Sequence, residues 1–392
     1  MFKVGGSSDF TNYLNKVFKT DNAVKLPKPM PIKVGLAILS NGGGYTVPMA
    51  IRSLQKECGN EVKTINYSSP LSYSDNKALS EEVRIILNYI EKHNLQDKYL
   101  SRADAFINLV KKDKIIFAKD LNEPIRKLSL QIINKITEDA KGLDGIFLPG
   151  GEDIPSIWYG GTECQDVYRT IVELTLINEA RKKGIPLMGV CRGMQVVNVY
   201  NGKTLLNHVP GQHGNQSFKL IEDGKKGLLA DIFKEGVTGI VMHHQGVSVE
   251  EGTNGKGDLE ALTAYAGLVK AAESKYPASA PVVLTQFHPE FYSSENTRGL
   301  SANNEDLFKT FHAGAIARGN KRQFITPEKL EEGRKNLTPV GTRQKKWEEN
   351  KAIQKTMKKQ LTLMGKLNRI ATDLFNRFNA WTQVHIFGKK PN

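Results

Sequence analysis

The chain has 392 residues, of which 39% are hydrophobic and 24% charged, and its formal net charge is +14. Three cysteines are too few for a disulfide framework, no stretch of about eighteen apolar residues could span a membrane, and the first residues lack the apolar core of a signal peptide. We therefore expect a soluble, cytoplasmic protein with one large domain and appended segments, although export by another route stays open.

The N-terminal third predicts the start of an α/β fold. Residues 1–30 are polar and end in a proline-rich stretch, which we interpret as a linker or a surface strap. An apolar strand over 32–39, a helical pattern over 47–58 and a second strand over 62–67 then form a β-α-β unit.

Residues 73–140 interrupt this unit with apolar positions at helical spacing, such as Leu79, Val83, Ile86 and Ile90. We predict a mostly helical insertion. Two interpretations stay open: a cap without function, or a lid that shapes specificity because it leaves the sheet close to the ligand crevice.

Cys191 is the first candidate functional residue. The sheet resumes over 145–148, a helix over 167–183 follows, and the apolar run 185–190 predicts a buried strand that ends directly before the cysteine. A helix-compatible segment begins at once, so the thiol falls on a sharp strand-to-helix turn, where helix amides favour a thiolate. The alternative is a buried structural cysteine.

A second candidate segment lies about a hundred residues later. The strand that begins at Pro281 ends at His288, and Glu290 follows two residues on. Acyl transfer by a thiol needs a base and a group that orients the base, and these two residues supply both. Alone, such a histidine is more often a packing residue and such a glutamate is usually solvated.

The third candidate segment is the turn Gly150-Gly151, which follows the strand over 145–148. Such a turn could aim a backbone N–H at an oxyanion.

Four ordered motifs make the chain resemble class I glutamine amidotransferase-like proteins, and most closely their γ-glutamyl hydrolase branch, the C26 peptidases. The motifs are Leu-Pro-Gly-Gly-x-Asp-Ile-Pro-Ser-x-x-Tyr-Gly over 148–160, Gly-Val-Cys-Arg-Gly-Met-Gln over 189–195, His-His-Gln-Gly-Val over 243–247 and Gln-Phe-His-Pro-Glu over 286–290. The resemblance covers 31–317 and implies a flavodoxin-like, doubly wound, mostly parallel sheet with a nucleophile elbow.

The resemblance also implies roles for individual residues. Cys191 corresponds to the nucleophile, His288 to its base and Glu290 to the orienting carboxylate, while Gly151 and Arg192 correspond to the backbone oxyanion donors. Positions on the substrate side are carried over more weakly, and they are Gln195, His244 and Gln245.

We predict no metal and no cofactor. Adjacent histidines on a strand, here His243 and His244, point to opposite faces, and no carboxylate or thiol stands nearby at ligand spacing. The glycines at 42–44 lack the spacing of a phosphate-binding loop. The resemblance implies no cofactor either.

Residues 259–274 allow two predictions. Their alanines favour a helix, whereas alternation on either side of Ala266-Gly267 suits a β-hairpin. The resemblance favours the hairpin, which we adopt.

The positive charge is concentrated in residues 318–392, which hold eighteen Lys and Arg against six Asp and Glu, or +12. Apolar residues recur there at three- and four-residue steps and predict a basic amphipathic helical extension. It could fold back on the catalytic domain, form a protein or homo-oligomer contact through 341–387, or bind a nucleic acid or membrane surface, and the first two are favoured.

These features predict a cysteine hydrolase that cleaves γ-glutamyl amides of a small compound, a peptide or a protein. One alternative is a glutaminase that supplies ammonia to a separate synthetase, although no synthetase domain is fused here. The other is a catalytically silent scaffold that acts through its basic helix. The sequence does not specify the leaving amine.

Overall fold

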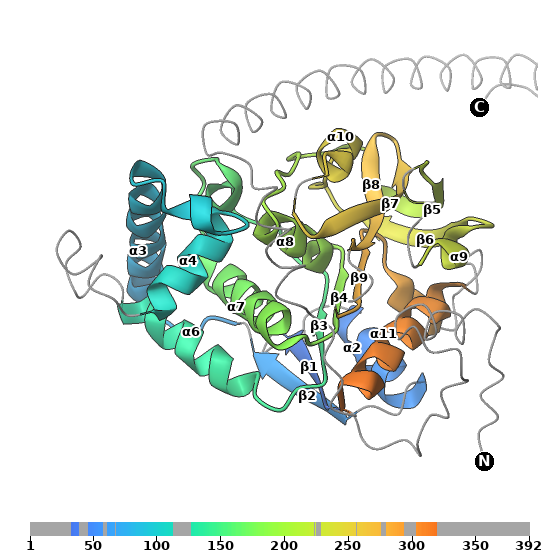
Figure 1. Cartoon of the computed structure of the whole chain (residues 1–392), viewed down its shortest axis with the longest axis horizontal. Coiled ribbons are helices and arrows are strands. Elements are labelled where there is room, and N and C mark those ends of the chain that lie inside the picture. The colour runs from blue at the N-terminus through green and yellow to red at the C-terminus, as the bar shows by residue number, and fades with distance from the viewer. Residues whose placement is uncertain are drawn as a thin grey trace, which may run out of the picture.

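A computed structural model gives the structure of the chain. It describes residues 33–38, 46–57, 61–66, 68–112, 127–222, 224, 229–255, 257–275, 280–293 and 303–319. The predicted linker and nearly all of the predicted basic extension lie outside these residues, and the domain boundaries stay predictions. The described part is a central sheet with helices on both faces (Figure 1).

The sheet has nine described strands in the order β2-β1-β3-β4-β9-β8-β7-β5-β6. The first five pair in parallel, and they are β2 (Glu61–Asn66), β1 (Lys33–Ile38), β3 (Gly145–Leu148), β4 (Leu187–Val190) and β9 (Val282–Thr285). The other four extend the sheet with antiparallel pairs, and they are β8 (Leu268–Ser274), β7 (Leu259–Tyr265), β5 (His213–Leu220) and β6 (Val237–Met242). The predicted α/β class is confirmed, with an antiparallel half added to the parallel core.

The predicted hairpin of 259–274 is confirmed, and the helical alternative is wrong. Strands β7 and β8 pair from Leu259 with Ser274 to Tyr265 with Leu268. The turn residues Ala266 and Gly267 both have positive φ, 52° and 76°, as a two-residue hairpin turn requires. Burial of this strand pair within the sheet overrides the helical propensity of its alanines.

Two apolar layers cover the sheet. On one face lie α2 (Thr46–Arg52), the π-helical turn η1 (Ser53–Glu57), the short α9 (Ala230–Phe233) and α11 (Asn303–Gly319), and on the other lie α7 (Val167–Lys183) and α8 (Arg192–Tyr200). Strand β3 shows the division, because Ile146 and Leu148 join the layer of α7 and α8 while Phe147 stacks on Phe308 of α11. None of the described helices is long and apolar enough to cross a membrane.

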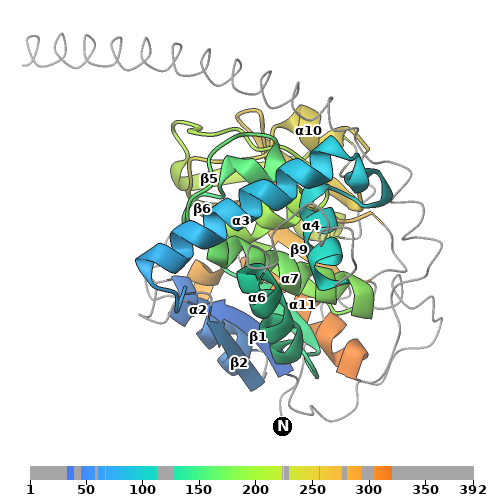
Figure 2. The same cartoon turned by 90° about the vertical axis from the view of Figure 1, so that its left-hand side faces the viewer.

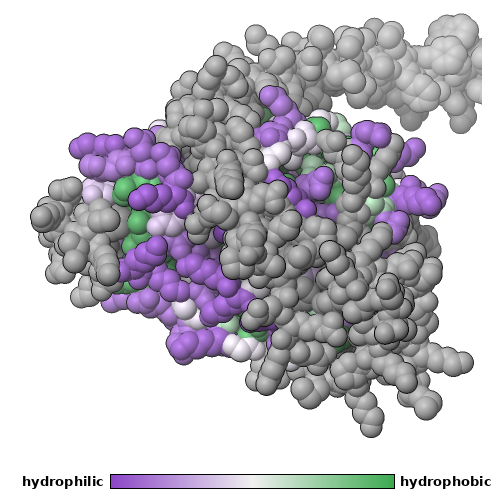
Figure 3. Space-filling model, in the orientation of Figure 1, coloured by the Kyte–Doolittle hydropathy of each residue, from purple (hydrophilic) through white to green (hydrophobic). Residues whose placement is uncertain are grey.

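The insertion is helical, as predicted, in its described parts. It comprises α3 (Tyr73–Lys92), the 3-10 turn η2 (Leu95–Lys98), α4 (Arg102–Lys111) and α6 (Lys127–Asp139). Ser72 and Ser101 cap α3 and α4 by accepting bonds from backbone amides. The three α-helices pack on the outer side of α7 (Figures 1 and 2), so α7 is buried almost all round. On the face seen in Figure 3, polar residues cover most of the described surface.

Candidate active site

Cys191 lies at a strained elbow between β4 and α8. Its φ of 52° and ψ of −108° are uncommon for a residue with a Cβ. The surrounding structure fixes this conformation, because the Cys191 amide donates to the Thr285 carbonyl at 2.7 Å and the Gln195 amide donates to the Cys191 carbonyl at 3.1 Å. Such strain persists only where neighbours over-determine the backbone, and it is concentrated at functional sites.

Two glycines allow the elbow to pack closely against the sheet. A Cβ at Gly193 would lie 2.1 Å from the Leu148 carbonyl oxygen, and one at Gly189 would lie 2.8 Å from the Gly193 backbone. Contacts of this kind exclude any side chain, so both glycines are required by close approach of the backbone.

His288 and Glu290 lie beside the elbow, at the carboxyl end of β9 and in the following 3-10 turn η6 (Pro289–Ser293). His288 Nδ1 and Glu290 Oε1 are 2.9 Å apart, and both residues are buried. A Cβ at Gly150 would lie 2.8 Å from His288 Cε1 and 3.4 Å from Cys191 Cβ, so the imidazole and the cysteine border the same glycine. The structure therefore brings the three predicted residues together.

The electrostatics of this group favour a charged imidazole. Burial alone would lower the pKa of His288, but the Glu290 carboxylate and the Cys191 thiol outweigh it and raise this pKa to about 10. At neutral pH the imidazole is consequently protonated, with a carboxylate on Nδ1. An imidazolium held next to a thiol is the environment in which a cysteine acts as a nucleophile.

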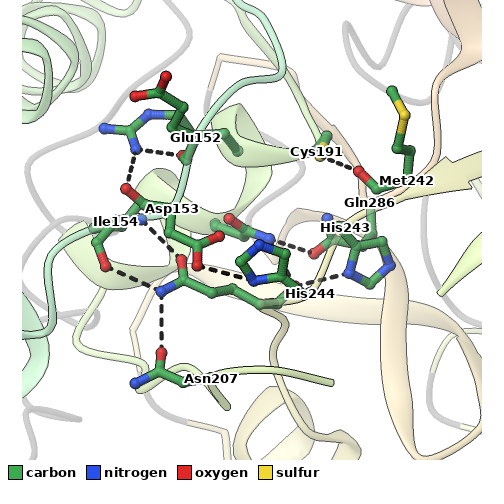
Figure 4. A network of polar contacts seen from close by, with 12 residues as sticks. Glu152, Asp153, Ile154, Cys191, Asn207, Met242, His243, His244 and Gln286 are labelled. Atoms are coloured by element: carbon green, nitrogen blue, oxygen red, sulfur yellow. Dashed lines mark hydrogen bonds and ion pairs between the residues drawn. The ribbon is translucent and has the colours of Figure 1, made fainter. Parts of the chain in front are cut away.

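The loop after β3 forms the other wall of the site. Gly151 has a φ of 157°, and its neighbour Gly150 contacts His288 and Cys191 as described. The Arg192 guanidinium donates to the carbonyls of Glu152 and Asp153 at 2.6 and 2.8 Å (Figure 4). As the first residue of α8, Arg192 also places its amide at the positive end of that helix. The predicted oxyanion donors thus lie on the two segments that flank the thiol.

The buried carboxylate of Glu173, on α7, binds two arginines that contact this loop, Arg169 and Arg192. Glu173 is fully buried, and its carboxylate accepts from Arg169 Nε at 2.7 Å and from Arg192 Nε at 3.0 Å. Arg169 in turn donates to the Gly150 carbonyl at 2.9 Å. A chain of charge-assisted hydrogen bonds therefore connects α7 to the loop that faces the thiol.

The three predicted substrate-side residues have different surroundings. Gln195 and Gln245 are buried and contact each other. The side-chain amide of Gln195 donates to the backbone carbonyl of Gln245 at 2.7 Å. The Gln245 side chain also accepts from the Ile154 amide at 2.8 Å and donates to Asn207 at 3.0 Å. These contacts favour a positioning role for both glutamines.

His244 differs from them because its side chain is 60% exposed. It lies 2.9 Å from an Asp153 carboxylate oxygen (Figure 4). Its ring also stacks on that of His208. It is therefore the one of the three whose side chain is open to a ligand, and its role stays a prediction. The neighbouring His243 turns inward, toward Lys270. Across the described residues there is no cluster of three or more side chains that could hold a metal ion.

No sequence motif marks Glu173, Arg169 or Lys270 as functional residues. A glutamate within the apolar run Ile171 to Ile177 was the available signal for a buried carboxylate, and a lysine between Val269 and Ala271 was the signal for a buried ammonium. Arg169 stands four residues before Glu173 on α7, but neither signal indicates the partners Arg192, Gln212 or His243, because these come from other parts of the chain.

Residues 124–290 match the family model for Peptidase C26. The matched range contains Cys191, His288 and Glu290 and ends at the last of them. This range is less than half of the chain, so the comparison shows a resemblance of residues 124–290 to that family. The chain is also 32% identical over 165 residues to a putative glutamine amidotransferase of Schizosaccharomyces pombe, covering 38% of this chain and 62% of that protein.

Two other proteins are similar to the chain. A putative glutamine amidotransferase of Mycobacterium tuberculosis is 27% identical over 162 residues, covering 38% of this chain and 51% of that protein. The glutaminase domain of Trypanosoma brucei CTPS, solved with bound acivicin, aligns with 76% of this chain and 97% of its own at 16% identity and a TM-score of 0.41. The chain thus spans less than two thirds of the length of the yeast and mycobacterial relatives.

Proposed function

We propose that this amidotransferase-like chain is a cysteine hydrolase that cleaves γ-glutamyl amide bonds through a thioester. One observation carries the proposal: a cysteine on a strained elbow borders the same glycine as a buried imidazole that is paired with a carboxylate at 2.9 Å. In the proposed mechanism His288 accepts the thiol proton and Glu290 holds the ring.

In the first half-reaction, the Cys191 thiolate attacks the γ-carbonyl carbon, and the carbonyl π electrons move to its oxygen. In this proposal the backbone amides of Gly151 and Arg192 donate to that oxyanion. Collapse of the tetrahedral intermediate breaks the C–N bond, and His288 gives its Nε2 proton to the departing amine. The product is a γ-glutamyl thioester and a free amine.

In the second half-reaction, water attacks the thioester while His288 takes the proton that water loses. Glu290 keeps the ring oriented, so the same nitrogen acts first as acid and then as base. The C–S bond breaks, glutamate leaves, and the Cys191 thiolate and the His288 imidazolium are restored.

The γ-glutamyl specificity is supported by the match to the Peptidase C26 model and by relatives whose names identify them as glutamine amidotransferases. Glutamine is itself a γ-glutamyl amide, with ammonia as its leaving group. Both kinds of relative therefore point to the same acyl group, and the leaving amine is the variable part.

The test is glutamate release from a panel of γ-glutamyl amides that includes glutamine, γ-glutamyl-GABA and a γ-glutamyl peptide. Cys164 offers a matched control, because it is a second buried, free cysteine. Cys164→Ala should hydrolyse the preferred amide at the native rate, and Cys191→Ala should not hydrolyse it. Equal rates for Cys191→Ala and the native protein would reject the proposal.

A further inference from the structure

Lys270 is an ammonium group with an unusual environment in this fold. It lies in the middle of β8, its side chain is fully buried, and β8 is enclosed between β7 and β9. Burying an unpaired charge is strongly unfavourable. Among the residues that the structure describes, no carboxylate forms an ion pair with Lys270, so its surroundings require another source of stabilisation.

Two neutral groups accept hydrogen bonds from Lys270. Its Nζ donates to Gln212 Oε1 and to His243 Nε2, the latter at 3.1 Å. His243 Nδ1 donates to the Gln245 carbonyl at 2.8 Å, and this bond leaves Nε2 as the acceptor. Burial, and after it the charge of Lys270, lowers the pKa of His243 to about 3, so this ring remains neutral. These partners orient the ammonium but do not neutralise it.

The group of opposite charge that interacts electrostatically with Lys270 is the nucleophile, Cys191. The Cys191 thiol lies 3.8 Å from the carbonyl of Met242, the residue that precedes His243. Burial lowers the pKa of Lys270 to about 7, and Cys191 opposes this effect. The interaction is reciprocal, so a charge on Lys270 favours the thiolate as much as the thiolate favours the ammonium. The other titratable groups around His243 are His288 and His244, and both carry positive charge when protonated.

The backbone also ties Lys270 to the site. The Gln286 amide donates to the Lys270 carbonyl at 2.8 Å, and Gln286 lies two residues before His288 on the same strand end. A displacement of β8 would therefore move the strand end that carries the proposed base.

We propose that Lys270 is a positioning residue for the thiolate: its ammonium, oriented by Gln212 and His243, places a positive charge near Cys191 that is independent of the His288–Glu290 pair. The inference rests on the proposed function. Because His288 gives its proton to the departing amine, a second cation keeps positive charge near the sulfur while the imidazole is neutral.

The test is the pH dependence of Cys191 alkylation by iodoacetamide in the full chain, followed by mass spectrometry of the peptide that contains Cys191. Lys270→Met removes the charge, and Lys270→Gln removes it while retaining an amide for Gln212 and His243. The matched control is Lys203→Met, because Lys203 is equally buried but donates to Asn254 beyond the far end of α8.

Both Lys270 variants should move the pH profile of the alkylation rate to higher pH. A shift by about one pH unit should lower the rate near pH 6 about tenfold. The rates should converge at about pH 9, since Lys270 is then uncharged in the native protein as well. Lys203→Met should retain the native profile. The pH profile of kcat/KM should move in the same direction on its acid side.

An unchanged profile in both Lys270 variants, with or without a loss of stability, would overturn the inference and leave Lys270 a structural residue. This failure differs from failure of the proposed function. In the latter case Cys191 of the native protein would react no faster than Cys164, whose thiol pKa is raised by burial.

Discussion

Glu173→Gln is a direct test of the ion-pair network that holds the loop facing the thiol. The carboxylate is fully buried and accepts from two arginines whose side chains are 12% and 2% exposed, Arg169 at 2.7 Å and Arg192 at 3.0 Å. Removing one partner of such a pair leaves buried positive charge uncompensated, which costs about 3–5 kcal/mol.

Glutamine retains one carbonyl acceptor, which recovers about 1 kcal/mol. The expected loss in the free energy of unfolding is therefore about 2–4 kcal/mol. Its amide NH₂ would face an arginine Nε–H, a contact between two donors, so no compensating bond forms. The assay is urea unfolding at neutral pH, followed by tryptophan fluorescence and circular dichroism.

Glu81→Gln is the matched control, because Glu81 pairs with Arg84 at the surface of α3. A pair of this exposure contributes about 0–1 kcal/mol, so the control should unfold close to the native protein. Glu173→Asp, which keeps the charge, should fall between the two. A loss below about 1 kcal/mol for Glu173→Gln would refute the view that this carboxylate compensates both arginines.

Three further predictions concern stability and are checked by denaturation of the full chain. Burial raises the pKa of Glu82 from 4.5 to about 7, despite the hydrogen bonds that its carboxylate accepts from Ser129. Between these two pH values the folded state holds a proton that the unfolded state has lost, so the free energy of unfolding should fall as pH rises from about 4.5 to about 7. Glu82→Gln should flatten this slope. A slope unchanged in that variant would show that Glu82 is not its source. Ala266 has a φ of 52° in the hairpin turn, so Ala266→Asn should stabilise the protein by about 0.5–1 kcal/mol, and a lower Tm would contradict this. Phe106 of the insertion is fully buried and meets Trp158 edge-on at 5.1 Å; Phe106→Ala should cost about 3–5 kcal/mol, and a loss near zero would mean that the insertion packs only loosely on the domain.

The parallel core and the group around Cys191 could be predicted from sequence because their signals are local. Strands buried on both faces appear as short apolar runs, and the elbow is bracketed by glycines that the backbone requires. The order of the antiparallel half could not be predicted, since β5 and β6 follow no local rule that places them beyond β7. The pairing of Glu173 with Arg192 and of Lys270 with Gln212 and His243 was equally inaccessible, because these partners lie on α8, before β5 and after the end of β6.

The central claim is that Cys191 forms a covalent acyl intermediate. Mixing the full chain with a γ-glutamyl amide, quenching in acid and digesting the protein allows each cysteine peptide to be weighed. We predict a glutamyl adduct on the peptide that contains Cys191 and none on the peptide that contains Cys164. In Cys191→Ala both the adduct and glutamate release should be lost. Continued glutamate release by Cys191→Ala would contradict a covalent role for Cys191.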